Sequence, residues 1–144
     1  MANKIPVIYT SERNMELGYV WKVIMNETAK IPAFCNRFPE LNHNEMEGFD
    51  MVSSTQALSE KFATILLVDS HDDVRIIKRM NVLRDLYREK NIPVHEVVLN
   101  IESSWHTVAH AVELGDAVSQ LVAKAYGVSP EEVPLVEDFK KRIA

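Results

Sequence analysis

Phe62-Ala63-Thr64-Ile65-Leu66-Leu67-Val68 is a run without a charged residue, and it decides the fold class of this 144-residue chain. A half-exposed strand alternates apolar and polar residues, whereas a continuous apolar run predicts a strand buried on both faces, as in a parallel sheet. Residues 69–73 follow with three acidic side chains, which favour the start of a helix. A helical apolar pattern then extends to about residue 90. The stretch therefore predicts a buried strand followed by a helix.

The same alternation continues in both directions along the chain. Further strands are expected at residues 5–9 and 93–99, and helices at 16–30, 105–126 and 134–144. Residues 31–48 are expected to form a loop, because Pro32 ends the preceding helix. Strands that alternate with helices indicate one α/β domain with a parallel sheet. Ligands bind such sheets beyond the C-terminal ends of the strands, where Ser11 follows the first strand and could cap a helix or bind a phosphate.

Residues 22–48 hold the densest mixture of ionisable and apolar side chains. Glu27 follows Ile24 by three residues and Val20 by seven, which predicts a position at the edge of the buried stripe of its helix. A carboxylate held there is expected to be partly desolvated, which suits it to proton transfer. His43 lies in the following loop and offers an imidazole as its partner. The alternative is an ordinary capping and turn region with solvated charges.

Two motifs in this segment carry a resemblance to a known family. They read Asn26-Glu27-Thr28-Ala29-Lys30-Ile31-Pro32-Ala33-Phe34 and Pro39-Glu40-Leu41-Asn42-His43-Asn44-Glu45. Both closely resemble the C-terminal domain of the bifunctional phosphoglucose/phosphomannose isomerases of archaea and bacteria, within the sugar isomerase (SIS) superfamily. The resemblance continues through LLVDS, VHEV, LGDAVSQLVA and the terminal FKKRI, and covers nearly the whole chain. It implies a flavodoxin-like, three-layer α/β/α sandwich with a mostly parallel sheet.

The resemblance also implies a chemistry without metal or coenzyme. Family members interconvert fructose 6-phosphate with glucose 6-phosphate or mannose 6-phosphate through a cis-enediol. The position of the base is Glu27, and the position of a ring-opening histidine, lent across a dimer interface, is His43. A lysine that assists at the ring oxygen falls on Lys140, with Lys141 as the competing choice. The substrate-binding candidates are Ser11, Lys30, Asn42 and Asn44.

The departures from the family pattern predict an incomplete enzyme. Family members carry two SIS domains, and the first supplies the hydroxyl groups that bind the substrate phosphate. The present sequence resembles the second domain alone, so a phosphate-binding SIS partner is expected. A hydroxyl residue linked with mannose 6-phosphate has no clear counterpart near Glu131, Glu132 and Val133. The alternative is a non-catalytic SIS module that binds sugar phosphates or mediates dimerisation, but the joint presence of Glu27, His43 and a C-terminal lysine favours catalysis.

The composition limits the cellular location and the binding partners that can be expected. A net charge of -5 argues against nucleic acid and anionic membrane surfaces as binding partners. The single cysteine, Cys35, excludes an intrachain disulfide and indicates a cytoplasmic location. No metal is expected, because His106 and His110 stand four apart without a supporting ligand motif. The basic face of the helix at 73–90 is predicted to be solvated. Broad apolar faces on the helices at 16–30 and 104–126 predict a homodimer or a complex with an N-terminal SIS domain.

Overall fold

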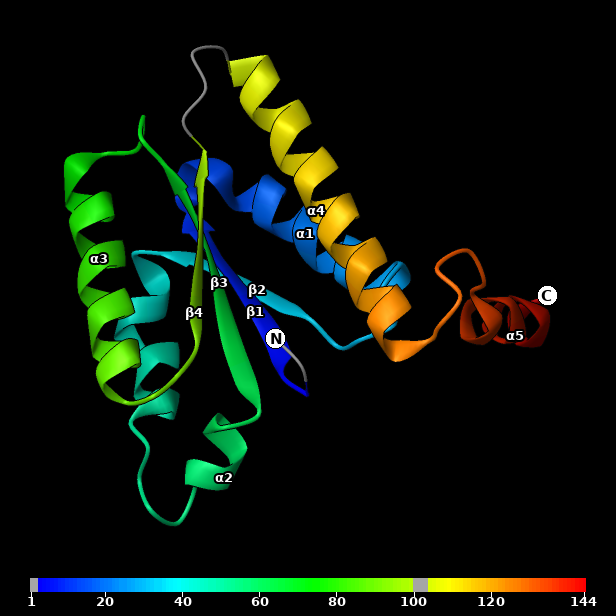
Figure 1. The fold of residues 1–144 in the computed structure, drawn as a ribbon, viewed down its shortest axis with the longest axis horizontal. Coiled ribbons are helices and arrows are strands. Elements are labelled where there is room, and N and C mark those ends of the chain that lie inside the picture. Colours follow the sequence, from blue (N-terminus) through cyan, green and yellow to red (C-terminus); the bar gives the residue numbers. More distant parts are fainter. Residues whose placement is uncertain (1–2, 100–103) are drawn as a thin grey trace.

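A computed structural model describes residues 3–99 and 104–144 (Figure 1). Its four strands are β1 (Ile5–Ser11), β2 (Phe34–Phe38), β3 (Phe62–Asp69) and β4 (Val94–Leu99). All neighbouring strands run parallel in the order β2-β1-β3-β4. The α-helices are α1 (Met15–Glu27), α2 (Gln56–Ser59), α3 (Val74–Glu89), α4 (Ser104–Tyr126) and α5 (Pro134–Ile143), and the 3-10 helices are η1 (Glu12–Asn14), η2 (Glu40–His43) and η3 (Glu45–Phe49).

The sheet is covered on both faces, which confirms the predicted three-layer α/β/α arrangement. One core cluster joins Leu66 of β3 to Leu83 of α3 and Leu41 of η2. A second cluster, on the opposite face, joins Ile65 and Leu67 of β3 to α1 and α4. In Figure 1, α3 lies on one side of the sheet and α1 with α4 on the other. The apolar run that begins at Phe62 is therefore buried on both sides, as its sequence predicts.

Strand β2 lies where the sequence predicts a loop, so that prediction is wrong. Among the described strands it pairs with β1 alone, with Ile8 opposite Cys35 in the register. An edge strand is less completely buried than a central one, so the half-buried Asn36 and Arg37 are tolerated on its two faces and interrupt the apolar pattern. Pro32 and Pro39 flank the strand, which has only five residues. Two prolines around so short a run are typical of a loop, and this led to the wrong prediction.

Helices α1 and α4 pack closely through one aromatic side chain. Trp21 is almost fully buried, and its Nε1 donates a hydrogen bond to the carbonyl oxygen of Ala111 at 2.8 Å. A Cβ atom at Gly115 would lie 3.0 Å from the Trp21 ring, so this glycine permits the close approach. The apolar face of α1 is thus covered by α4 and the sheet. Helix α4 still exposes Trp105 and Leu121.

Candidate active site

The motif at residues 39–45 is anchored to the sheet by its apolar and acidic members. Leu41 is fully buried in the core. Tyr9 of β1 donates its hydroxyl to Glu45 Oε1 at 2.7 Å, and the Asn36 side chain donates to the other carboxylate oxygen. Asn44 Oδ1 accepts from the backbone N–H of Glu45 at 2.6 Å and caps η3. These contacts fix the backbone on both sides of His43.

His43 itself is exposed at the end of η2. Its neighbours Asn42 and Asn44 are engaged locally: Asn42 Nδ2 lies 3.8 Å from Met46 Sδ, and Asn44 Nδ2 donates to Glu40 Oε1 at 2.9 Å. The Asn42 Oδ1 atom is buried and has no hydrogen-bond partner among the described residues. The fold therefore holds the backbone firmly and presents the imidazole to the surroundings.

Glu27 is the last residue of α1, and it is exposed. The expected partial burial is therefore wrong for this chain on its own. The buried stripe of α1 is centred on Leu17, Trp21 and Met25, and successive helical residues are about 100° apart. Glu27 follows Met25 by two residues and so points to nearly the opposite side. Val20, which suggested the edge position, is itself only half-buried.

A cavity of about 660 Å³ lies beside Glu27, between the end of α1 and the connection from α4 to α5. Its volume falls in the range of small-molecule sites. Lys30 adopts a left-handed backbone conformation with φ 56°, and its Nζ donates to the carbonyl oxygens of Glu27 and Pro130. Among the described residues that line this cavity, Lys30 is the only cation. Its described lining thus offers two carboxylates, Glu27 and Glu132, and a lysine already bonded to two carbonyl oxygens, but no cluster of cations for a phosphate.

Lys140 is exposed on α5 and forms an ion pair with Glu137 at 2.8 Å. Lys141, the competing choice, is also exposed. The first residues of α5, including Val136, line the cavity beside Glu27. A helix rises about 1.5 Å per residue, so Lys140 starts roughly 6 Å further along the axis than Val136. Glu27 and α5 thus belong to one end of the molecule.

One chain does not bring Glu27 and His43 together. Helix α1 ends before β2 begins, and η2 starts after β2 ends. The five residues of β2 span about 16 Å at the usual rise of a strand. The carboxylate and the imidazole therefore lie toward opposite ends of this strand. An acid-base pair built from these two side chains requires two copies of the chain.

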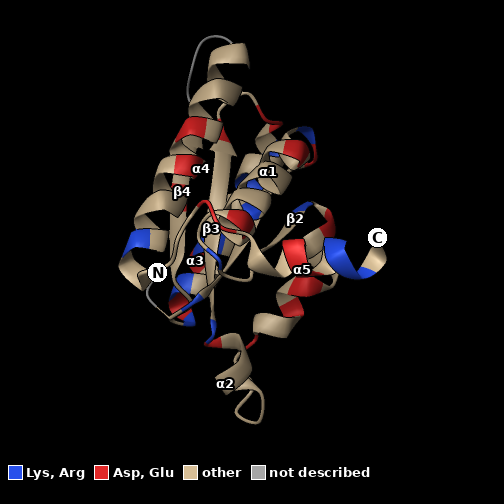
Figure 2. Cartoon of the chain, turned by 90° about the vertical axis from the view of Figure 1, so that its right-hand side faces the viewer, with Lys and Arg blue, Asp and Glu red and all other residues tan. Residues whose placement is uncertain are grey.

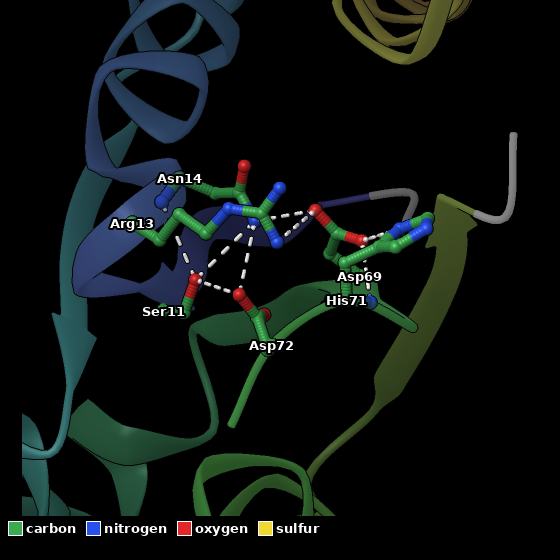
Figure 3. A network of polar contacts seen from close by, with 6 residues as sticks. All are labelled: Ser11, Arg13, Asn14, Asp69, His71 and Asp72. Atoms are coloured by element: carbon green, nitrogen blue, oxygen red, sulfur yellow. Dashed lines mark hydrogen bonds and ion pairs between the residues drawn. The ribbon is translucent and has the colours of Figure 1, made fainter. Parts of the chain in front are cut away.

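Ser11 belongs to a different polar network at the C-terminal ends of β1 and β3 (Figure 3). Its hydroxyl accepts from the backbone N–H of Asn14 at 3.3 Å and donates to Asp72 Oδ1 at 2.7 Å. The predicted capping role is confirmed, with η1 as the capped helix. Asp69 lies in the same network, 3.1 Å from Asn14 Nδ2. Two adjacent carboxylates make this an unfavourable place for a phosphate anion.

The pKa values of the two carboxylates in this network, Asp69 and Asp72, are shifted in opposite directions. Burial alone would raise the pKa of Asp69, but hydrogen bonds from His71 and Asn14, with the nearby Arg13 guanidinium, lower it overall. Burial, reinforced by the charge of Asp69, raises the pKa of Asp72 despite its hydrogen bond from Ser11. The sequence placed Ser11 and Asp69 at the C-terminal ends of their strands, but it did not predict the hydrogen bonds through Asn14 and Asp72 that join them.

Neither a metal cluster nor a membrane span is found in the described part of the chain. No group of three or more His, Cys, Asp or Glu side chains is placed to hold a metal ion within residues 3–99 and 104–144. His106 and His110 are both exposed on α4. Over the same residues, every helix is too short or too polar to cross a bilayer.

Comparison with known proteins gives a consistent set of relatives. The family model for the bacterial phospho-glucose isomerase C-terminal SIS domain matches residues 1–143. The bifunctional phosphoglucose/phosphomannose isomerase of Thermoplasma acidophilum is 32% identical over 141 residues, covering 98% of this chain and 43% of that protein. The D-glucosamine-6-phosphate 4-epimerase of Sulfolobus acidocaldarius is 36% identical over 142 residues, covering 99% and 40%. The chain thus spans about two fifths of the length of these relatives.

A solved structure supports the fold. A glucose-6-phosphate isomerase like protein from Thermus thermophilus superposes with a TM-score of 0.67 at 12% identity, covering 91% of this chain and 42% of that one. At this identity the likeness concerns the fold alone. It agrees with the parallel sheet between two helical layers, and so with the predicted SIS architecture.

Proposed function

The chain belongs to the family of bacterial phosphoglucose isomerase C-terminal SIS domains, and from this premise we propose that it is the catalytic half of a hexose 6-phosphate aldose–ketose isomerase. One observation carries the proposal. In the first motif, the side chains of Asn26 and Lys30 bond to backbone carbonyl oxygens and hold the backbone around Glu27. In the second motif, Glu45 anchors the segment around His43 to the sheet. Glu27 and His43 themselves are exposed. A rigid backbone that presents a carboxylate and an imidazole is what proton transfer between substrate carbons needs.

Each proposed role follows from the chemistry of the group. The Glu27 carboxylate takes a proton from C1 of the open-chain ketose while O2 gains a proton, which forms the cis-enediol. Return of the carbon-bound proton to C2 and loss of the O1 proton then give the aldose. His43 of a second copy moves the proton that opens the sugar ring, since an imidazole exchanges protons near neutral pH. The Lys140 ammonium, with Lys141 as the competing choice, stabilises negative charge at the ring oxygen.

Substrate phosphate binding is assigned to a partner SIS domain. The cavity beside Glu27 has Lys30 as the only cation among its described lining residues, and the Lys30 ammonium is already bonded to two carbonyl oxygens. Ser11 is bonded to Asp72 beside a second carboxylate. Asn42 and Asn44 flank His43 and are proposed to contact the sugar hydroxyls. The single thiol, Cys35, supports a reducing, cytoplasmic setting for this reaction.

The test is an isomerase assay with fructose 6-phosphate, on the chain alone and with the N-terminal part of the Thermoplasma acidophilum relative added. Remote phosphate binding helps to position the reacting carbons, so the chain alone should turn over far below the roughly 10 per second of ordinary enzymes. Addition of the missing domain should raise the rate. Solvent tritium should appear at C2 of the product, because the enediol route exchanges that proton. Inactivity in both arms would favour a non-catalytic sugar-phosphate-binding or dimerisation module.

The relative from Sulfolobus acidocaldarius supports a second candidate, epimerisation of an amino-sugar phosphate. That protein is named as a D-glucosamine-6-phosphate 4-epimerase and is 36% identical over 142 residues. The same assay with glucosamine 6-phosphate, read by proton NMR, separates the two candidates. Inversion at C4 without ketose formation would favour the epimerase, and ketose formation from glucose 6-phosphate would favour the isomerase.

A further inference from the structure

A groove of about 530 Å³ runs between α3 and the η2–η3 segment, outside the cavity beside Glu27. The two elements lie side by side in Figure 1, and Met46 of η3 packs against the core cluster that contains Leu83 of α3. The base of the groove is apolar and consists of Met46, Val82, Leu83 and Leu86. Val82 and Leu86 are 50% and 37% exposed, so a ligand can reach this base. We refer to this surface as the α3 groove.

One end of the α3 groove is cationic. Arg75, Lys78 and Arg79 line it, and none of its described lining residues is acidic. Arg75 is paired with Asp73 at 2.7 Å, whereas the exposed side chains of Lys78 and Arg79 form no hydrogen bond or ion pair with any described residue. Figure 2, which views the molecule from the side of α5, shows acidic and basic bands intermixed on that helix instead. Two cations without an acidic neighbour favour an anionic ligand.

The cations and the apolar residues occupy successive turns of one face of α3. Arg75, Arg79, Val82 and Leu86 follow one another at spacings of four, three and four residues. At the helical rise of about 1.5 Å per residue, Arg75 and Leu86 lie roughly 16 Å apart along the axis. Hydroxyl groups of a sugar ring would lose hydrogen bonds to water on this apolar base. The groove therefore suits an elongated ligand with an anionic end and a flat, largely apolar body.

A polar side chain, Asn42, reaches the groove from the opposite wall. Its Oδ1 atom is buried without a hydrogen-bond partner among the described residues, and its Nδ2 lies 3.8 Å from Met46 Sδ, a weak acceptor. Because no strong bond holds this side chain, a rotation can turn the amide toward a ligand. An asparagine amide recognises adenine, since its oxygen accepts from the N6 amino group and its nitrogen donates to N7.

We propose that the α3 groove binds an adenine nucleotide. The adenine ring lies on Val82 and Leu86, beside the polarisable Met46 sulfur, and its amino edge meets the Asn42 amide. The phosphates extend along α3 to the cationic end of the groove, where they pair with the two free cations. Apolar contact, base recognition and charge thus come from three different parts of one groove. Its volume falls in the range of small-molecule sites.

Nucleotide binding at this groove would affect the proposed active site. Asn42 precedes His43 and is a proposed contact of the sugar hydroxyls. A nucleotide that engages the Asn42 amide would withdraw this contact and raise the KM for fructose 6-phosphate. This consequence rests on the proposed function, whereas the binding itself does not and is measured without sugar.

Isothermal titration calorimetry of the chain with ATP tests the binding, and saturable heat is expected. Inosine triphosphate (ITP) carries an oxygen acceptor in place of the 6-amino group, so its Kd should be about tenfold higher, because the hydrogen bond to the amide oxygen is lost. Inorganic triphosphate should bind more weakly than ATP, because it leaves the apolar base uncovered. Equal Kd values for ATP and ITP, or no saturable binding at millimolar ATP, would overturn the proposal.

Substitutions locate the binding. Lys78→Glu with Arg79→Glu should raise the Kd of ATP about tenfold, because two attractive pairs become repulsive. Lys61→Glu with Lys124→Glu makes the same change of net charge at other exposed positions and should leave the Kd nearly unchanged. Asn42→Ala should raise the Kd of ATP to that of ITP, so that the difference between the two nucleotides disappears. Equal effects of the two charge exchanges, or a difference between ATP and ITP that persists in Asn42→Ala, would overturn the assignment to the α3 groove.

Discussion

Tyr9→Phe should loosen the segment that carries His43 while leaving the sheet intact. Tyr9 is fully buried in β1, and its hydroxyl donates to the Glu45 carboxylate at 2.7 Å. Burial, followed by the nearby Tyr87 and Glu45, raises the pKa of Tyr9, so the hydroxyl keeps its proton and remains a donor. Phenylalanine fills the same space without that donor. The variant therefore removes the hydrogen bond between the sheet and η3.

The expected loss of unfolding free energy depends on the charge and the exposure of the acceptor, the Glu45 carboxylate. A hydrogen bond to a charged group contributes about 1.5–3 kcal/mol to the free energy of unfolding. Glu45 is half-buried and keeps its bond from Asn36, so water can replace the lost donor in part. The lower end, about 1.5 kcal/mol, is expected. For a chain of this size each kcal/mol corresponds to about 2–4 °C, which predicts a Tm lower by roughly 3–6 °C.

The assay is thermal unfolding followed by circular dichroism, with hydrogen exchange as a local readout. Tyr19→Phe is the matched control, because Tyr19 is 50% exposed and its ring contacts only the Lys22 ammonium among the interactions described. Amides of η2 and η3 should exchange faster in Tyr9→Phe, and those of β3 should not. Combination with Glu45→Gln should be less than additive. A Tm equal to that of Tyr19→Phe, or full additivity, would refute the anchoring role of Glu45.

Two further predictions concern the scaffold behind the site. Gly18→Ala should lower the free energy of unfolding by about 1–3 kcal/mol in urea titration, because overpacking outweighs the better helix propensity. The new Cβ would lie 2.8 Å from Thr10 Cγ2. Gly48→Ala is the control and should be nearly neutral, because no atom lies within 4 Å of its new Cβ. Equal losses of unfolding free energy in the two variants would contradict this packing argument. Asp69→Asn should destabilise the fold at neutral pH and lose this effect in acid. The folded pKa of Asp69 is lowered, so its ionised form stabilises the fold above the ordinary pKa of 3.8. This contribution disappears as the pH falls from 3.8 through the folded pKa. Urea titrations of both proteins at pH 7 and at strongly acidic pH measure this, and a difference that persists unchanged into acid would count against it.

The apolar patterns were sufficient for the central layers of the fold. The unbroken run at Phe62 predicted a doubly buried strand, and the helices that flank it followed from their 3.6-residue spacing. The edge strand β2 could not be predicted in the same way, because it is short and mostly half-buried and carries the polar Asn36 and Arg37 on its two faces. Tertiary packing, rather than local pattern, makes it a strand.

The candidate site was predictable by motif but not by geometry. Sequence spacing placed Glu27 at a buried edge, yet the stripe centred on Trp21 and Met25 turns it outward. The motif gave no sign that Glu45 would anchor the segment to Tyr9, a contact between residues 36 positions apart. Such long-range pairs depend on the sheet order, which a single sequence does not reveal.

The proton-transfer role of Glu27 is tested most directly by Glu27→Gln, assayed together with a phosphate-binding SIS partner. The amide is nearly isosteric and can still form hydrogen bonds, but it cannot take up a proton. Because Glu27 is exposed, the Tm should stay unchanged, while fructose 6-phosphate isomerisation should fall about 100- to 10,000-fold. Wild-type turnover in the Gln variant, measured on the same folded sample, would contradict the assignment of Glu27 as the base.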